Sequence, residues 1–111
     1  MARAATNSDV FNAVAEPRRR AILDLLAKEE RPVQELVVAL ELDQPAVSKH
    51  LRVLREVGLV DIRKEGRQRL YRTNASGLKP VHDWVKRYEQ YWQNQLERIK
   101  RSAESKEKRN D

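Results

Sequence analysis

The sequence predicts a mainly α-helical domain with one small β-hairpin. Apolar residues recur at three- and four-residue steps along most of the chain, which is the spacing of amphipathic helices. Between residues 59 and 73 this spacing gives way to two short runs of β-forming residues around a glycine. A length of 111 residues suits one domain, which we expect to span residues 8–101. It lies between a disordered end at 1–7 and a disordered or frayed helical end at 102–111.

Composition and charge narrow the class of protein. The chain has no cysteine, which excludes disulfide frameworks and cysteine-based metal sites. It also lacks a secretory apolar stretch and a run near the ~20 apolar residues of a membrane span, so we expect a cytoplasmic protein. The net charge is +6, and residues 44–77 hold eight basic against three acidic side chains. Such a region is typical of a phosphate-backbone binder, although a solvated charged surface explains it equally well.

The first two predicted helices are short. Ser8 and Asp9 can cap the first, which ends before Pro17 because the residue before a proline avoids the α region. Pro17 suits the first turn of the second helix. The buried stripe of that helix consists of Ile22, Leu25 and Leu26. We interpret the three arginines at 18–20 as a solvated helix face, from which one side chain could still touch a phosphate.

A third and a fourth helix follow with a very short break between them. Pro32 opens the third helix, whose buried face consists of Val33, Leu36, Val37 and Leu40. Leu42 and Asp43 interrupt the pattern, and Asp43 can accept hydrogen bonds from the free amides of the fourth helix. That helix ends at Gly58. Two helices joined by so short a turn form a helix-turn-helix unit.

The fourth helix has one apolar and one polar face. Val47, Leu51 and Leu54 form the buried side. The polar face that we expect to contact DNA consists of Gln44, Pro45, Ser48, Lys49 and Arg52. A helix fits the major groove of B-DNA, where short polar groups reach base edges and arginines reach phosphates. An ordinary amphipathic surface helix is the alternative.

The next segment predicts a cationic hairpin. Residues 59–63 and 69–73 read as strands, and Gly66 supplies the positive φ of the turn between them. Cations crowd the hairpin, and those that we expect to contact DNA are Arg63, Lys64, Arg67 and Arg69. A basic ribbon directly after a groove-reading helix is a wing, whose tip can reach the adjacent minor groove.

A long helical pattern begins at Gly77 and Leu78 and is rich in aromatic residues. Five of the six aromatic residues of the chain lie between Tyr71 and Trp92, and protein interfaces are enriched in Trp and Tyr. We therefore expect a two-fold homodimer, in which this helix and the first helix pack across the axis. The expected interface residues are Phe11, Trp84, Tyr88, Tyr91, Trp92, Leu96 and Ile99. Internal packing alone and an aromatic cofactor site are the alternatives, and we expect no cofactor.

The run Asp43–Val60, DQPAVSKHLRVLREVGLV, resembles the recognition-helix segment of ArsR-type bacterial repressors. Pro17–Leu23 resembles the start of their second helix, and the likeness extends over residues 9–100. The resemblance implies a homodimeric winged helix-turn-helix with element order α-α-α-α-β-β-α. It also implies a repressor that binds a palindromic operator on double-stranded DNA and reads bases with its fourth helix.

The same resemblance bears on metal sensing. Many of these repressors hold metal through a cysteine pair on the third helix, and the matching positions here are Pro32 and Gln34, which cannot bind a thiophilic metal. Others bind zinc between C-terminal helices, where this chain offers only His82, Asp83 and Glu89. A tetrahedral zinc site needs four ligands, so zinc here would require a second copy. The aromatic-rich last helix is similar to that of the metal-independent autorepressors, and we expect no metal.

Catalysis and other binding functions fit the residues less well. His50 lies beside the buried stripe, so we expect a packed or hydrogen-bonded side chain, with a phosphate contact as the second interpretation. Neither His50 nor Ser48 has a matched base or nucleophile, so we expect no enzyme. A protein-assembly module would not need so basic a hairpin. An RNA reader is disfavoured because a helix cannot enter the narrow major groove of A-form RNA.

Overall fold

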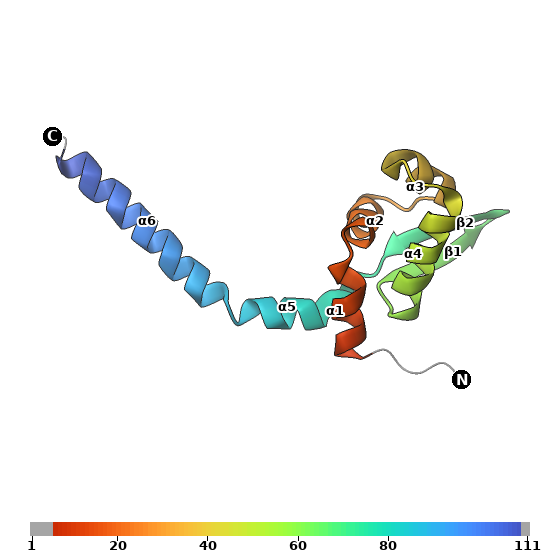
Figure 1. Ribbon diagram of the computed structural model, residues 1–111, viewed down its shortest axis with the longest axis horizontal. Helices are drawn as coiled ribbons and strands as arrows, with labels where there is room; N and C mark the ends of the chain where they lie inside the picture. The colour runs from red at the N-terminus through yellow and green to blue at the C-terminus, as the bar shows by residue number, and fades with distance from the viewer. Residues whose placement is uncertain (1–5, 110–111) are drawn as a thin grey trace. The chain divides into compact units, whose positions relative to one another are not determined.

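The computed structural model describes residues 6–109, with side chains described through residue 106. The chain divides into two compact units at Val81 and His82. The elements in order are α1 (Asn7–Ala15), α2 (Pro17–Lys28), α3 (Val33–Leu40), α4 (Gln44–Glu56), β1 (Val60–Glu65), β2 (Gln68–Thr73), a 3-10 turn (Ala75–Leu78), α5 (Lys79–Lys86) and α6 (Glu89–Arg109). Figure 1 shows α2, α3 and α4 gathered beside the hairpin in the first unit.

The core of the first unit is made by the apolar stripes that the sequence predicts. Its almost fully buried side chains are Ile22, Leu36, Val47, Leu51, Leu54 and Leu59. These come from α2, α3, α4 and the start of the hairpin, so one cluster joins the helices to the sheet. Full burial of such a side chain contributes about 1.5–3 kcal/mol relative to exposure. No buried polar or charged residue interrupts this core within the described residues.

The hairpin is regular and is fixed to the helices. β1 and β2 pair antiparallel from Val60 opposite Thr73 to Glu65 opposite Gln68. The turn therefore has two residues rather than the five expected, and Gly66 adopts a φ of 61° in it. Tyr71 also exchanges two backbone hydrogen bonds with Arg31, of 3.0 and 2.9 Å. This bridge holds β2 against the segment between α2 and α3. The contact matters because an isolated hairpin is only marginally stable in water.

The helix caps agree with the sequence in one place and differ in another. Asp43 caps α4 as expected, and its carboxylate accepts a hydrogen bond of 2.8 Å from the N–H of Ala46. The expected cap of α1 at Ser8 and Asp9 is wrong, since the N-cap residue is Thr6. Thr6 and Asp9 form a reciprocal capping box, in which the carboxylate of Asp9 accepts from the N–H of Thr6.

The last part of the chain is two helices rather than the single one expected. α5 ends in a tight turn, where the N–H groups of Arg87 and Tyr88 bond to the carbonyls of Trp84 and Val85, three residues earlier. These bonds interrupt the α-helical ladder before α6 begins at Glu89. The sequence contains no proline or glycine at this point, so its pattern gave no indication of a break.

We expect a disordered or frayed helical end at 102–111, and the segment is helical as far as residue 109, because α6 continues to Arg109. The reason is composition, since alanine, glutamate, lysine and arginine are strong helix formers and no glycine or proline stops them. The remaining two residues, and residues 1–5 of the expected disordered N-terminus, lie outside the described part. Within that part, every helix is too short or too polar to cross a membrane.

Candidate nucleic-acid interface

The polar face of α4 is presented to solvent because its apolar face is buried. Val47, Leu51 and Leu54 lie in the core. At helical spacing this places the expected DNA-contacting residues on the opposite side. Ser48 is half-buried, and the other four side chains are exposed, namely Gln44, Pro45, Lys49 and Arg52. The packing of α4 thus leaves free the side chains that could enter a DNA groove.

A groove of about 470 Å³ joins this face to the hairpin. Its lining comes from the start of α3, the start of α4 and strand β2 with its turn: Pro32, Val33, Gln34, Gln44, Ser48, Arg67, Arg69 and Tyr71. Two of the expected base readers and two of the expected wing cations therefore share one concave surface. Pro45, Lys49, Arg52 and Lys64 do not line it. No carboxylate lines the groove, so its charge is positive.

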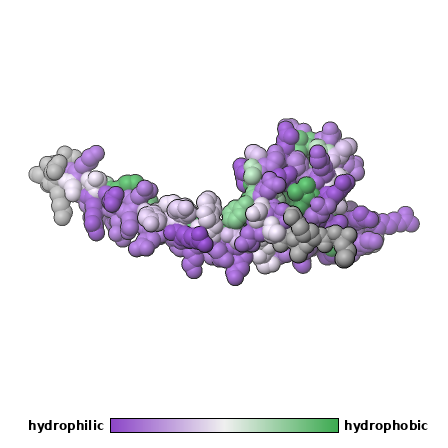
Figure 2. Space-filling view, turned by 60° about the horizontal axis from the view of Figure 1, so that its bottom comes forward, coloured by the Kyte–Doolittle hydropathy of each residue, from purple (hydrophilic) through white to green (hydrophobic). Residues whose placement is uncertain are grey.

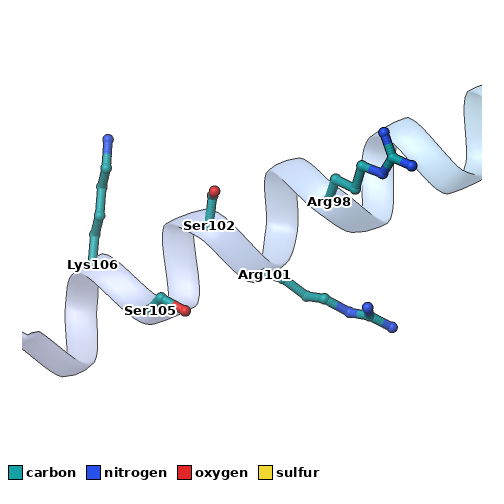
Figure 3. Close-up of a pocket in the computed structure, with 5 residues that line it drawn as sticks. All are labelled: Arg98, Arg101, Ser102, Ser105 and Lys106. Atoms are coloured by element: carbon teal, nitrogen blue, oxygen red, sulfur yellow. The ribbon is translucent and has the colours of Figure 1, made fainter.

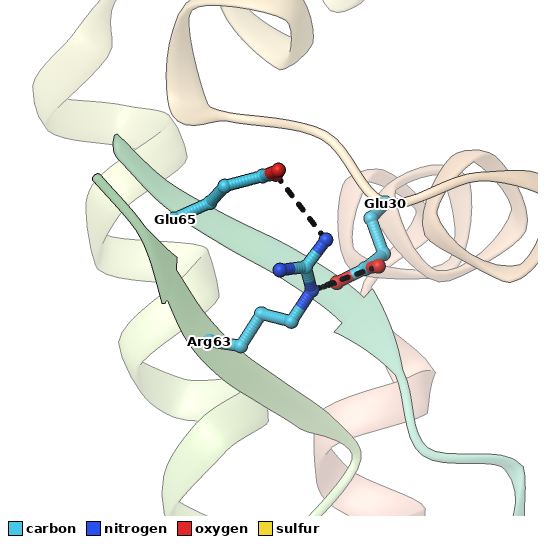
Figure 4. A network of polar contacts seen from close by, with 3 residues as sticks. All are labelled: Glu30, Arg63 and Glu65. Carbon is cyan, nitrogen blue, oxygen red and sulfur yellow. Dashed lines mark hydrogen bonds and ion pairs between the residues drawn. The ribbon is translucent and has the colours of Figure 1, made fainter. Parts of the chain in front are cut away.

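Arg63 is engaged within the protein. Its Nε lies 2.8 Å from Oε2 of Glu30, and its Nη2 lies 3.3 Å from Oε2 of Glu65 (Figure 4). The hydrogen bond and charge of Glu30, followed by Glu65, raise the pKa of Arg63 above its usual value. The ion pair connects β1 to the segment between α2 and α3. The expected phosphate contact of Arg63 stays a prediction, and DNA would have to compete with two carboxylates for it.

The other hairpin cations are not occupied in this way. None of the ion pairs found among the described residues involves Lys64, Arg67 or Arg69. All three side chains are exposed. One arginine of the hairpin therefore holds it in place, whereas these three cations face solvent.

The arginines at 18–20 have a role that the sequence interpretation missed. Nε of Arg19 donates to the carbonyl of Ala13 at 2.6 Å, and Nη1 of Arg20 donates to the carbonyl of Val14 at 2.8 Å. Both side chains thus satisfy carbonyls that the end of α1 leaves without a helical partner. Arg18 is exposed. The sequence did contain an indication of this role. A helix that ends before Pro17 leaves carbonyls without helical partners, close to the first turn of the next helix.

His50 is half-buried on the side of α4 that faces the start of α2. Burial lowers the pKa of His50, the charge of Glu16 opposes this shift, and Arg19, Arg18 and Lys49 reinforce it. Partial burial raises the pKa of Glu16, but hydrogen bonds from the backbone N–H groups of Arg19 and Arg18 outweigh it, so that pKa is lowered. The lowered pKa favours the neutral form of His50, in agreement with a packed side chain rather than a cationic one.

The expected dimer residues of the second unit form an exposed apolar surface. The six side chains Trp84, Tyr88, Tyr91, Trp92, Leu96 and Ile99 are between 44% and 65% exposed. The rings of Trp84 and Tyr88 meet edge to face at 5.6 Å, and a shallow hollow of about 320 Å³ adjoins Trp92 and Leu96. In Figure 2 the surface of α6 is mostly polar with a small apolar patch. The seventh residue, Phe11, is half-buried in α1.

The described side chains in the C-terminal half of α6 border an open hollow rather than an enclosed site (Figure 3). This hollow is bounded by Arg98, Arg101, Ser102, Ser105 and Lys106. Figure 3 shows that all five come from one helix and extend away from it into the open. Among the residues that the structure describes, no three histidine, cysteine, aspartate or glutamate side chains are grouped to hold a metal ion.

Comparison with known proteins supports the interpretation of the fold. Residues 16–61 match the family described as "Bacterial regulatory protein, arsR family". The HTH-type transcriptional repressor SmtB of Mycobacterium tuberculosis is 44% identical over 64 residues, which are 58% of this chain and 47% of SmtB. The chain thus spans about half the length of this relative.

Two solved structures extend the likeness beyond the matched segment. An ArsR-like transcriptional regulator from Rhodococcus sp. RHA1 has a TM-score of 0.69 and 32% identity, covering 88% of this chain and 90% of that one. A homodimeric winged helix-turn-helix DNA-binding domain from Mycobacterium bovis has a TM-score of 0.62 and 32% identity, covering 74% and 79%. The helices, the hairpin and the exposed face of α4 define a winged helix-turn-helix protein, which confirms the predicted fold class.

The particular family follows from these likenesses. The chain belongs to the ArsR family of bacterial transcriptional regulators. This is a family of regulators and not of enzymes.

The environment of His50 leads to an expected pH dependence of stability. Because the folded state lowers its pKa below the ordinary value of 6.5, the unfolded state binds the proton more readily. The stability that neutral His50 contributes is present above about pH 6.5 and is lost as pH falls through the lower folded pKa. Urea unfolding between about pH 7.5 and about pH 5 should show wild type losing more unfolding free energy than His50→Gln. Parallel curves for the two proteins would contradict this.

Proposed function

We propose that the chain is a homodimeric, sequence-specific DNA-binding repressor that binds a palindromic operator. Such a protein acts on the chromosome, so its location is cytoplasmic. α4 enters the major groove and reads base edges through Gln44 and Ser48, flanked by Pro45, Lys49 and Arg52. Lys64, Arg67 and Arg69 contact phosphates or the adjacent minor groove.

The observation that carries this proposal is the shared positive groove. It places the short polar groups of α4 and two unpaired hairpin arginines on one surface, without a carboxylate among them. Phosphate contacts supply most of the affinity of DNA-binding proteins, and base contacts supply the specificity. A surface that combines both kinds of group suits a duplex better than a protein partner. Arg63 has a structural role, because its ion pair with Glu30 holds the hairpin against the helices.

Selection of bound duplexes from a random pool tests the proposal directly. We expect the purified protein to enrich one sequence with two-fold symmetry. Replacing Gln44 or Ser48 with alanine should weaken binding to that sequence by ~1–3 kcal/mol, while binding to random DNA changes little. The reason is that a base contact contributes only on the correct sequence. A pool that enriches nothing would refute sequence-specific binding, and equal losses on both duplexes would assign these residues to the backbone.

The hairpin should contribute a salt-dependent part of the affinity. We expect the double variant Arg67→Ala/Arg69→Ala to bind every duplex more weakly. The slope of log K against log salt should also fall, by about 0.9 for each phosphate that the variant no longer neutralises. The double variant Arg98→Ala/Arg101→Ala, which removes two exposed arginines of α6, serves as the charge-matched control and should leave the slope unchanged. Equal slopes for wild type and the double variant would exclude the hairpin from the DNA interface.

The exposed apolar surface of the second unit supports assembly into a homodimer. Exposed apolar side chains of this size are an aggregation hazard for a monomer, and a second copy removes them from water. The Mycobacterium bovis domain, which is similar in fold, is described as homodimeric. Two copies would present two α4 helices to successive major grooves, about 34 Å apart.

Truncation of this surface should weaken the dimer. Trp92→Ala combined with Leu96→Ala removes two exposed apolar side chains, and truncated interface anchors often cost about 2 kcal/mol or more each. Sedimentation equilibrium should show a higher dimer dissociation constant, and operator binding should depend more steeply on protein concentration. Lys100→Ala on the same helix is the control. A monomeric wild type, or an unchanged dimer constant, would reject this assignment.

We also place the protein among the metal-independent regulators of its family. The chain has no cysteine, and a metal-holding cluster is absent from its described residues. We expect zinc, cadmium and arsenite to leave operator affinity unchanged in a fluorescence anisotropy titration. A change of tenfold or more, which is about 1.4 kcal/mol of coupling, would place the protein among the metal sensors instead.

A further inference from the structure

Gln34 lies in the first turn of α3 and contacts the helix proposed to read DNA. Its side-chain Nε2 donates a hydrogen bond of 3.2 Å to Oε1 of Gln44, the first residue of α4. Both side chains are exposed, and both line the positive groove together with Ser48 and Arg67. The hydrogen bond therefore joins the two helices of the helix-turn-helix unit inside the proposed interface, not on its outer side.

This hydrogen bond restricts the carboxamide of Gln44. A glutamine side chain has several rotatable bonds, and holding it in one orientation costs conformational entropy. A contact that already exists in the free protein removes part of that cost from the binding step, which raises affinity by preorganisation. The gain applies only where the carboxamide must meet a particular base. The contacts of Arg67 and Arg69 with phosphates do not depend on it.

The bond also determines which group of Gln44 remains available. Gln34 occupies one lone pair of the Gln44 oxygen, whereas the amino group of Gln44 has no partner among the described residues. Free N–H donors match the acceptors on the major-groove edge, which are N7 of purines, O6 of guanine and O4 of thymine. They do not match the amino group of cytosine.

We propose that Gln34 is a positioning residue, which orients the Gln44 amino group toward an acceptor on a base edge and so determines specificity at one base pair of each operator half-site. The proposal rests on the proposed function, because it requires Gln44 to read a base in duplex DNA. Gln34 itself acts through Gln44 and needs no contact with the DNA.

A double-mutant cycle tests the coupling between the two glutamines. The probes are a fluorescent duplex carrying the sequence that wild type selects and a scrambled duplex of the same length. We expect Gln34→Ala to weaken binding to the selected duplex about three- to tenfold, as loss of one hydrogen bond does, and to leave the scrambled duplex unaffected. In a Gln44→Ala background the same change should have no further effect. Equal losses in both backgrounds, or on both duplexes, would overturn the proposal.

The base preference of a charge variant separates positioning from a merely structural role. In Gln34→Glu the side chain has no N–H donor, and its carboxylate can only accept from the amino group of Gln44. The Gln44 oxygen then becomes the free group. Repeated selection should show the preference moving toward cytosine, which presents only an amino donor on the major-groove edge, at the one position that Gln44→Ala also affects. An unchanged preference at that position would overturn the proposal.

Two controls keep the outcomes distinct. Gln90→Ala removes an exposed glutamine of α6, outside the groove, and should bind both duplexes as wild type does. Thermal unfolding of Gln34→Ala should match wild type, because alanine is a good helix former at an exposed position. If wild type enriches no sequence, the proposed function fails and the role of Gln34 fails with it. If wild type enriches a sequence but the cycle shows no coupling, only the role of Gln34 fails.

Discussion

The burial of one edge of α4 is the constraint on which the rest of the structure depends. Val47, Leu51 and Leu54 insert into a core shared with α2, α3 and the hairpin. A helix that is fixed along one edge has no freedom to rotate, so the opposite edge is fixed as well. Gln44 and Ser48 are held in place in this way. Asp43 sets where the helix starts, because its carboxylate caps the first turn.

The placement of the hairpin follows from the same core through two further contacts. The backbone bridge between Arg31 and Tyr71 fixes one strand, and the ion pair between Arg63 and Glu30 fixes the other. These contacts bring the hairpin arginines beside α4, which makes one groove of two elements. The basic residues of α2 and the hairpin thus differ in whether they have partners inside the protein. Arg19, Arg20 and Arg63 stabilise the fold through internal partners, whereas the unpaired hairpin cations remain available for phosphate.

Much of this architecture could be predicted because it is encoded locally. The apolar spacing of α2, α3 and α4, the cap at Asp43 and the turn at Gly66 depend on residues close in sequence. Contacts between distant residues could not be predicted. Arg63 and Glu30 are 33 positions apart, so the sequence did not indicate that this cation has carboxylate partners. The break after α5 was missed for another reason. It shows only as a change of backbone hydrogen bonding near Tyr88, and no proline or glycine marks it in the sequence. The roles of the individual DNA-contacting and dimer residues stay predictions.

The central claim is that one surface, made of the start of α4 and the hairpin, receives the DNA. Two-dimensional ¹H–¹⁵N correlation spectra recorded while the selected duplex is added test it residue by residue, without altering the protein. We expect the largest shift changes at the amides of Gln44, Ser48, Arg67 and Arg69, which border the groove. Largest changes on α6, or changes spread evenly over the first unit, would contradict the account.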